Sequence, residues 1–87
     1  MYFEYDSLKS SINEKKHGIS FKEAKELWND EQLIEVPARS DGESRFFCIG
    51  KIGDKFWTAV ITYRGDSKRI ISVRRAREEE VNLYDNY

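Results

Sequence analysis

The residues best suited to chemistry in this chain of 87 residues are arginines that recur along its second half. Arg64 ends one apolar stretch, and Arg74 and Arg75 end the next. Guanidinium groups are permanently charged and offer paired N–H donors, so several on one sheet face are suited to binding phosphate. RNA carries its own nucleophile, the 2′-hydroxyl. Such a face could therefore cut RNA without a metal by holding the phosphate, neutralising the transition state and moving a proton.

Four side chains are candidates for moving that proton: Lys16, His17, Glu43 and Glu80. Two of them also have ordinary structural interpretations. His17 precedes Gly18 at a predicted helix end, where a cation interacts favourably with the helix dipole, and Glu80 lies in an acidic run suited to a helix start. Arginines that alternate along a strand are likewise typical of a solvated sheet face. The residue types alone leave a catalytic site and a solvated surface both open.

The sequence predicts neither a metal site nor a cofactor. A single His and a single Cys cannot form a structural zinc site of the usual kind, and no glycine-rich phosphate loop is present. One Cys also excludes an intramolecular disulfide, and the longest uncharged stretch, residues 56–63, is too short to span a membrane. The first residues lack the pattern of a signal peptide. We therefore expect a cytoplasmic protein that does not enter a membrane.

The elements that must position these residues follow from caps and periodicity. Asp6 or Ser7 is expected to begin a helix that ends at Gly18, and residues 20–23 form a capping box that begins a second helix. Further elements are expected as strands over residues 33–36, 45–52, 56–64 and 68–75, and as a short helix over 78–84. This order predicts an α+β fold over a single domain, residues 1–87. N-terminal helices pack on an antiparallel sheet of three to four strands, and a C-terminal helix follows.

Alternation along the strands predicts which face of the sheet each arginine occupies. Trp57, Ala59 and Ile61 form an apolar face that should meet the helices, which places Arg64 on the opposite face. In the next strand, one of Arg74 and Arg75 must share the face of Arg64, because consecutive residues point to opposite sides.

The net charge of −1 conceals a strongly basic segment. Between positions 45 and 77, nine Lys and Arg residues stand against two Asp. Near-neutrality of the whole chain argues only against binding nucleic acid by bulk charge, and a local basic face remains available.

Several motifs resemble those of one protein family, in order and in spacing. They are Phe3-Glu4-Tyr5-Asp6, Lys16-His17-Gly18, Glu43-Ser44-Arg45, Tyr63-Arg64-Gly65 and Arg69-Ile70-Ile71-Ser72-Val73-Arg74-Arg75-Ala76. Together they resemble the BrnT family of bacterial toxins over essentially the whole chain. The resemblance implies a RelE-like fold and a ribonuclease toxin of a type II toxin–antitoxin system, which arrests growth by cutting RNA. It also implies a cognate antitoxin with a ribbon-helix-helix part, through which alone the toxin would contact operator DNA.

Carried over residue by residue, the resemblance implies that Arg64, Arg74 and Arg75 act on the RNA phosphate. Lys16 and His17 follow in importance, and Glu80 completes the predicted catalytic set. Arg45, Lys68 and Arg69 are predicted to bind substrate. The alternative is a non-catalytic module that binds RNA or an acidic protein partner with the same basic face. Arg77 departs from the family, which more often has Thr or Ser there, so we expect a poorly capped last helix.

Overall fold

The first helix has the boundaries that its caps predict. The computed structural model describes residues 2–39 and 41–87, and in it α1 (Ser7–His17) begins after Asp6. The Asp6 carboxylate accepts hydrogen bonds from the backbone N–H groups of Leu8 and Lys9, at 2.8 and 3.1 Å. The helix ends at Gly18, whose φ of 80° lies in the left-handed region that glycine adopts at low cost. Both cap predictions are confirmed.

The predicted capping box begins the second helix, α2 (Phe21–Ala24). The Glu23 N–H donates to Ser20 Oγ at 3.1 Å, and the Ser20 N–H donates to Glu23 Oε1 at 3.0 Å. The chain then tightens into a 3₁₀ helix, η1 (Lys25–Asn29), in place of a continuous α-helix. Phe21, Ala24 and Leu27 are buried.

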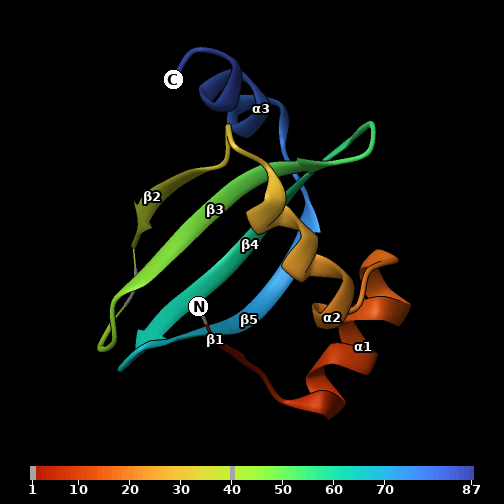
Figure 1. The fold of residues 1–87 in the computed structure, drawn as a ribbon, viewed down its shortest axis with the longest axis vertical. Coiled ribbons are helices and arrows are strands. Elements are labelled where there is room, and N and C mark those ends of the chain that lie inside the picture. Colours follow the sequence, from red (N-terminus) through yellow and green to blue (C-terminus); the bar gives the residue numbers. More distant parts are fainter. Residues whose placement is uncertain (1, 40) are drawn as a thin grey trace.

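The sheet contains five strands, and four of them form the antiparallel meander that the sequence predicts. In chain order they are β1 (Tyr2–Glu4), β2 (Ile34–Ala38), β3 (Arg45–Ile52), β4 (Lys55–Arg64) and β5 (Ser67–Arg75), and in space they follow the order β1-β5-β4-β3-β2 (Figure 1). The unpredicted strand, β1, pairs in parallel with β5. Three residues are too few to show the alternation of a strand, which is why the pattern does not reveal it. The α+β class is confirmed, with a mixed sheet of five strands.

One face of the sheet, here called the helix face, packs against α1, α2 and η1 to form the core (Figure 1). Its buried residues include Cys48, Trp57, Ala59, Ile61, Ile70 and Val73. No helix in the described part of the chain is long and apolar enough to cross a membrane.

Polar residues attach α1 to the sheet. Asn13 is buried, and its side-chain amide donates to the carbonyl oxygens of Ile19 and Val73 while its oxygen accepts from the Val73 N–H, at distances from 2.9 to 3.2 Å. By contrast, Leu8 and Ile12, which lie on one side of the helix, are 69% and 54% exposed. The apolar side of α1 therefore does not face the core.

A β-bulge in β5 changes which residues share a face. Val60 pairs with Ser72, whereas Ile61 pairs with Ile70, so Ile71 is the extra residue. Strict alternation would place the arginines at positions 69 and 74 on opposite faces. The bulge brings both onto the face opposite α1, α2 and η1, here called the open face.

The last helix, α3 (Glu78–Asp85), covers one end of the open face. Its Tyr84 ring packs against the Phe56 ring with centroids 5.2 Å apart, and the Tyr84 hydroxyl donates to Asp30 at 2.8 Å. The Arg77 side chain makes no capping hydrogen bond, but the Arg77 N–H donates to Glu80 Oε1 at 2.8 Å, as in a capping box, so the start of this helix is better capped than predicted. The other end of the open face, toward the β4–β5 turn, is not covered by any helix within residues 2–39 and 41–87.

Candidate functional site

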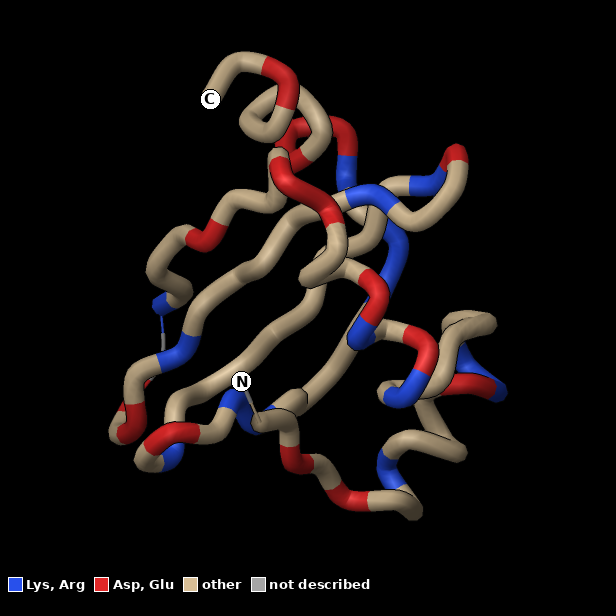
Figure 2. Tube along the Cα trace, in the orientation of Figure 1, with Lys and Arg blue, Asp and Glu red and all other residues tan. Residues whose placement is uncertain are grey.

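The structure does not bring Arg64, Arg74 and Arg75 together. Arg74 pairs with Thr58 near the start of β4, and Arg64 ends the same strand six residues later, about 20 Å away at the usual rise per residue. Arg75 pairs with Trp57 and lies on the helix face. The prediction that one of the two consecutive arginines shares the face of Arg64 is confirmed, and that residue is Arg74. Figure 2 shows Lys and Arg positions at both ends of the long strands.

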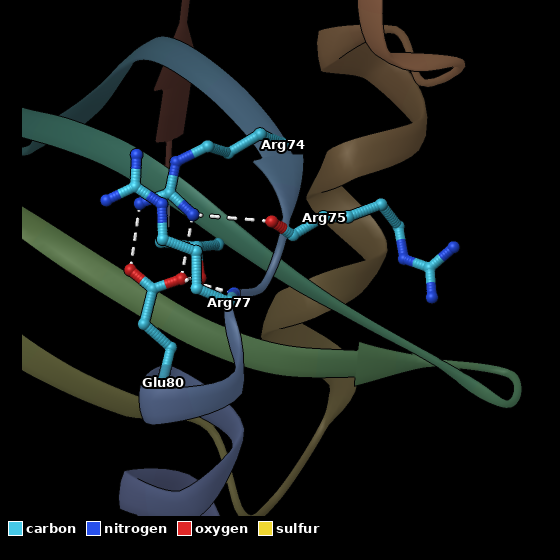
Figure 3. Close-up of polar contacts among 5 residues, drawn as sticks. Arg74, Arg75, Arg77 and Glu80 are labelled. Carbon is cyan, nitrogen blue, oxygen red and sulfur yellow. Dashed lines mark hydrogen bonds and ion pairs between the residues drawn. The ribbon is translucent and has the colours of Figure 1, made fainter.

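Arg74 and Glu80 form a clamp between β5 and α3. The guanidinium donates to both carboxylate oxygens of Glu80, at 2.7 and 2.8 Å (Figure 3). The Thr58 hydroxyl and the Arg77 N–H also donate to Glu80 Oε1, at 2.9 and 2.8 Å. Burial by itself raises the pKa of Glu80, but these hydrogen bonds and the charge of Arg74 outweigh it and lower the pKa to about 2. The carboxylate is thus fully engaged in holding α3.

This clamp predicts a specific loss of stability in acid. The pKa of Glu80 falls from an ordinary 4.5 to about 2 on folding, so its stabilising effect is complete above pH 4.5 and is lost as the pH falls toward 2. We expect the difference in free energy of unfolding between the wild type and Glu80→Gln to shrink over that interval. Urea titrations at pH 7, 4 and 2.5 measure it, and a difference that stays constant with pH would contradict the assignment.

Arg75 belongs to a separate region on the helix face. Its guanidinium carbon lies 5.5 Å from the centre of the Trp57 ring, and Figure 3 shows its side chain extending away from Arg74 and Glu80. Trp57 lines a pocket of about 580 Å³, here called the Trp57 pocket. Its other lining residues are Gly18, Ile19, Lys22, Glu23, Glu26, Ile52 and Lys55. Lys16 and His17 directly precede Gly18, in the basic last turn of α1, so they belong to this end of the molecule.

Two further arginines, Arg45 and Arg69, lie with Arg64 on the uncovered part of the open face. Arg69 pairs with Thr62, and the Thr62 hydroxyl donates to the Ser44 carbonyl oxygen at 2.7 Å, which places the next residue, Arg45, beside Thr62. Arg64 follows two positions later on the same face of β4. Strands lie about 4.8 Å apart, so the long side chains from β3, β4 and β5 can reach one phosphate group. We call Arg45, Arg64 and Arg69 the arginine cluster.

Glu4 lies within this cluster, and sequence reasoning missed it. It pairs with Arg69 across the parallel β1–β5 ladder, and its Oε1 atom lies 3.8 Å from Arg64 Nε and 3.7 Å from Arg69 Nη1. These distances are too long for hydrogen bonds. The only signal in the sequence was its place in the Phe3-Glu4-Tyr5-Asp6 motif, because the pairing of β1 could not be predicted.

Two buried polar atoms in this cluster have no hydrogen-bond partner among the described residues. They are Glu4 Oε1 and Arg45 Nε. Arg45 also approaches Glu43, with Nη2 3.9 Å from its Oε1. Native proteins satisfy nearly all buried polar atoms, and exceptions gather at sites that bind or react. This makes the arginine cluster the strongest candidate site.

Lys68 is not part of the arginine cluster, although it adjoins Arg69 in sequence. It is buried on the helix face, with its ammonium group 5.3 Å from the Trp28 ring centre and 5.7 Å from that of Tyr63. Lys68 is predicted to bind substrate together with the arginines, but its side chain lies on the opposite face of the sheet from the arginine cluster. The described residues contain no group of three or more His, Cys, Asp or Glu side chains that could hold a metal ion.

The fold and this cluster define a small α+β domain whose uncovered sheet face carries cationic groups of the kind that bind phosphate. A family model described as the ribonuclease toxin BrnT of a type II toxin–antitoxin system matches residues 5–80. The chain belongs to this family, which confirms the resemblance, and the family is one of ribonuclease toxins with a cognate antitoxin. A search of proteins with curated functions found no match.

Proposed function

We propose that this protein cuts RNA by attack of a 2′-hydroxyl on the adjacent phosphate, without a metal, and that the arginine cluster holds that phosphate. The observation that carries the proposal is the convergence of Arg45, Arg64 and Arg69 from three neighbouring strands onto one uncovered surface. Family membership supplies the class of reaction.

This reaction requires the protein mainly to position the phosphate and to supply positive charge beside it. As the 2′-oxygen attacks, negative charge accumulates on the phosphorus oxygens, and guanidinium groups already in place stabilise it without having to reorganise. Two carboxylates, Glu4 and Glu43, lie within 4 Å of the three guanidinium groups, so at that distance positive charges outnumber negative ones. The expected products are a 2′,3′-cyclic phosphate and a 5′-hydroxyl.

The two other arginine locations support this reaction less well. Arg74 donates two short hydrogen bonds to a buried carboxylate, so binding phosphate there would break the clamp on α3. Arg75 lies over the ring of Trp57, which lines the Trp57 pocket, and Lys16 and His17 directly precede Gly18, which also lines it. This pocket is therefore the second candidate for the active site. Catalytic roles for Arg75, Lys16 and His17 remain predictions attached to that pocket.

We further propose that the antitoxin carries a ribbon-helix-helix part, contacts operator DNA on behalf of the complex, and covers the open face. The support is the family and the exposure of the arginine cluster, since a partner that inhibits the toxin must block its substrate. Because the substrate is RNA, the proposed compartment is the cytoplasm.

Cleavage is expected to persist in excess EDTA and to require the 2′-hydroxyl. The test uses toxin released from its antitoxin by denaturation and refolded, with an end-labelled RNA of mixed sequence. Products should carry 2′,3′-cyclic phosphate ends, and replacing the ribose at a mapped cleavage site by deoxyribose should abolish cleavage there. Intact RNA despite measurable binding would favour the non-catalytic module, and loss of cleavage in EDTA would contradict metal independence.

A further inference from the structure

The arginine cluster contains one carboxylate whose position suits a base. We propose that Glu4 is the general base of this ribonuclease, an inference that rests on the proposed function. Glu4 ends β1, the only strand that pairs in parallel within the described sheet, and this pairing places its carboxylate beside Arg69 on the open face. Its Oε1 atom lies 3.7 and 3.8 Å from two arginines proposed to hold the phosphate.

The hydrogen bonding of Glu4 differs from that of other carboxylates in the structure. Glu80 accepts four hydrogen bonds, Glu23 completes a capping box and Glu35 accepts from the Tyr63 hydroxyl at 2.6 Å. Glu4 Oε1 is buried and accepts none. A carboxylate oxygen that is held in place and not engaged by a donor keeps a lone pair available for a substrate proton.

The edge strand fixes the position of this oxygen. Phe3 anchors β1 from the helix face, where its ring packs edge-on against Trp28 with centroids 4.9 Å apart. Because side chains alternate along a strand, this anchor turns the next residue, Glu4, toward the open face. The contacts with Arg64 and Arg69 place the carboxylate next to the two guanidinium groups that are proposed to hold the phosphate.

Of the other carboxylates near the cluster, Glu43 is the one that competes with Glu4 as a base. Asp6 is engaged as the N-cap of α1, and hydrogen bonds from the backbone of Lys9 and Leu8 outweigh the effect of burial and keep its pKa below the ordinary value. Glu43 lies on the β2–β3 connection, 3.9 Å from Arg45, and is the alternative base. The experiment below therefore includes both Glu4 and Glu43.

In the proposed step, Glu4 takes the proton of the 2′-hydroxyl as the 2′-oxygen bonds to phosphorus. The bond between phosphorus and the 5′-oxygen breaks, and that oxygen takes a proton from water. The protonated Glu4 then returns its proton to solvent. No covalent bond to the protein forms, and nothing is oxidised or reduced.

The test compares Glu4→Gln, Glu43→Gln and Asp66→Asn with the wild type. Asp66 lies in the exposed β4–β5 turn, so its substitution removes a similar charge near the cluster without touching the proposed base. We expect Glu4→Gln to lower kcat/KM for RNA cleavage by about 100-fold or more, in the range of general bases. Binding to a non-cleavable 2′-deoxy analogue should stay equal or become tighter. Asp66→Asn should stay within a few-fold of the wild type, and Glu43→Gln tests the alternative base.

The pH profile separates a base from a structural carboxylate. Wild-type kcat/KM should rise with pH through the acidic range and then level, and Glu4→Gln should lose this rise. Should Glu4→Gln fail to fold, Glu4→Asp keeps a carboxylate one methylene shorter, and it should cleave more slowly with the acidic rise retained. Wild-type rates in Glu4→Gln, or a selective loss in Glu43→Gln, would overturn the assignment while leaving the ribonuclease proposal intact. A wild type that does not cleave RNA would refute both.

Discussion

Replacing Arg69 by Ala is expected to lower the rate of RNA cleavage by about 100- to 1,000-fold, the usual effect of removing one preorganised charge-stabilising group from an active site. Arg69 is the central member of the arginine cluster, because it pairs with Thr62 on one side and with Glu4 on the other. Its guanidinium is also the least exposed of the three, with the side chain 29% accessible, so its charge acts with less screening by water. Single-turnover cleavage of labelled RNA by refolded toxin measures the effect.

The matched variant is Arg75→Ala, which removes the same charge from the opposite face of β5. If the arginine cluster is the active site, Arg75→Ala should cleave RNA within a few-fold of the wild type. Induced expression of Arg75→Ala should still arrest growth, whereas Arg69→Ala should relieve the arrest. The reverse pattern would move the active site to the Trp57 pocket, whose Trp57 ring Arg75 covers.

Both arginine variants need a check on folding. The ion pair of Arg69 with Glu4 is long, so removing Arg69 should change the free energy of unfolding little. The guanidinium of Arg75 lies over the ring of Trp57, so a modest loss of stability is expected for Arg75→Ala. Circular dichroism of each refolded variant, together with binding to the antitoxin, separates a lost active site from a lost fold.

Glu80→Ala is expected to destabilise the protein by about 3 kcal/mol, in the range found when one partner of a buried ion pair is removed. The Glu80 side chain is 11% accessible and that of Arg74 is 21% accessible, so the substitution leaves a largely buried guanidinium without its carboxylate. It also removes the acceptor of the Arg77 N–H at the start of α3 and that of the Thr58 hydroxyl. Native stabilities are commonly 5–15 kcal/mol, so a loss of about 3 kcal/mol is a large fraction of the total.

Glu79→Ala provides the control for this substitution. Glu79 lies next to Glu80 in the first turn of α3 and is exposed, so its removal should cost no more than about 0.5 kcal/mol. Urea unfolding followed by circular dichroism compares the two variants at neutral pH. Equal, small effects would show that the clamp between β5 and α3 contributes little. A folded Glu80→Ala variant that had lost cleavage with unchanged stability would instead restore Glu80 to the catalytic set.

Local sequence signals predicted the elements well, because each depends on neighbouring residues. Asp6 and Gly18 set the two ends of α1. The Asp6 side chain accepts hydrogen bonds from the first backbone N–H groups, and Gly18 adopts the positive φ that ends the helix. The Ser20–Glu23 capping box begins α2 within four residues. The strand over residues 45–52 has the predicted boundaries, because half of its residues are aromatic or β-branched and turn residues follow it.

Contacts between distant segments could not be predicted in this way. The bulge at Ile71 arises from the fit between β4 and β5, and it alone places Arg69 and Arg74 on the same face. Strict alternation therefore predicts which residues of β5 share a face only when both lie on the same side of Ile71. The hydrogen-bonded ion pair between Arg74 and Glu80 depends on where α3 packs against the sheet, and no local sequence pattern predicts that position.

The sequence by itself determined the order of the α-helices and of the four antiparallel strands, the basic character of the second half and, through its motifs, the family. Only the tertiary structure decided which charged residues share a site. It separated Arg64, Arg74 and Arg75 and joined Arg45, Arg64 and Arg69 with Glu4. The physical reason is that helix caps and strand periods act between near neighbours, whereas a site depends on pairings between distant strands. The parallel contact of β1 with β5 is one such pairing, and it brings residue 4 beside residue 69.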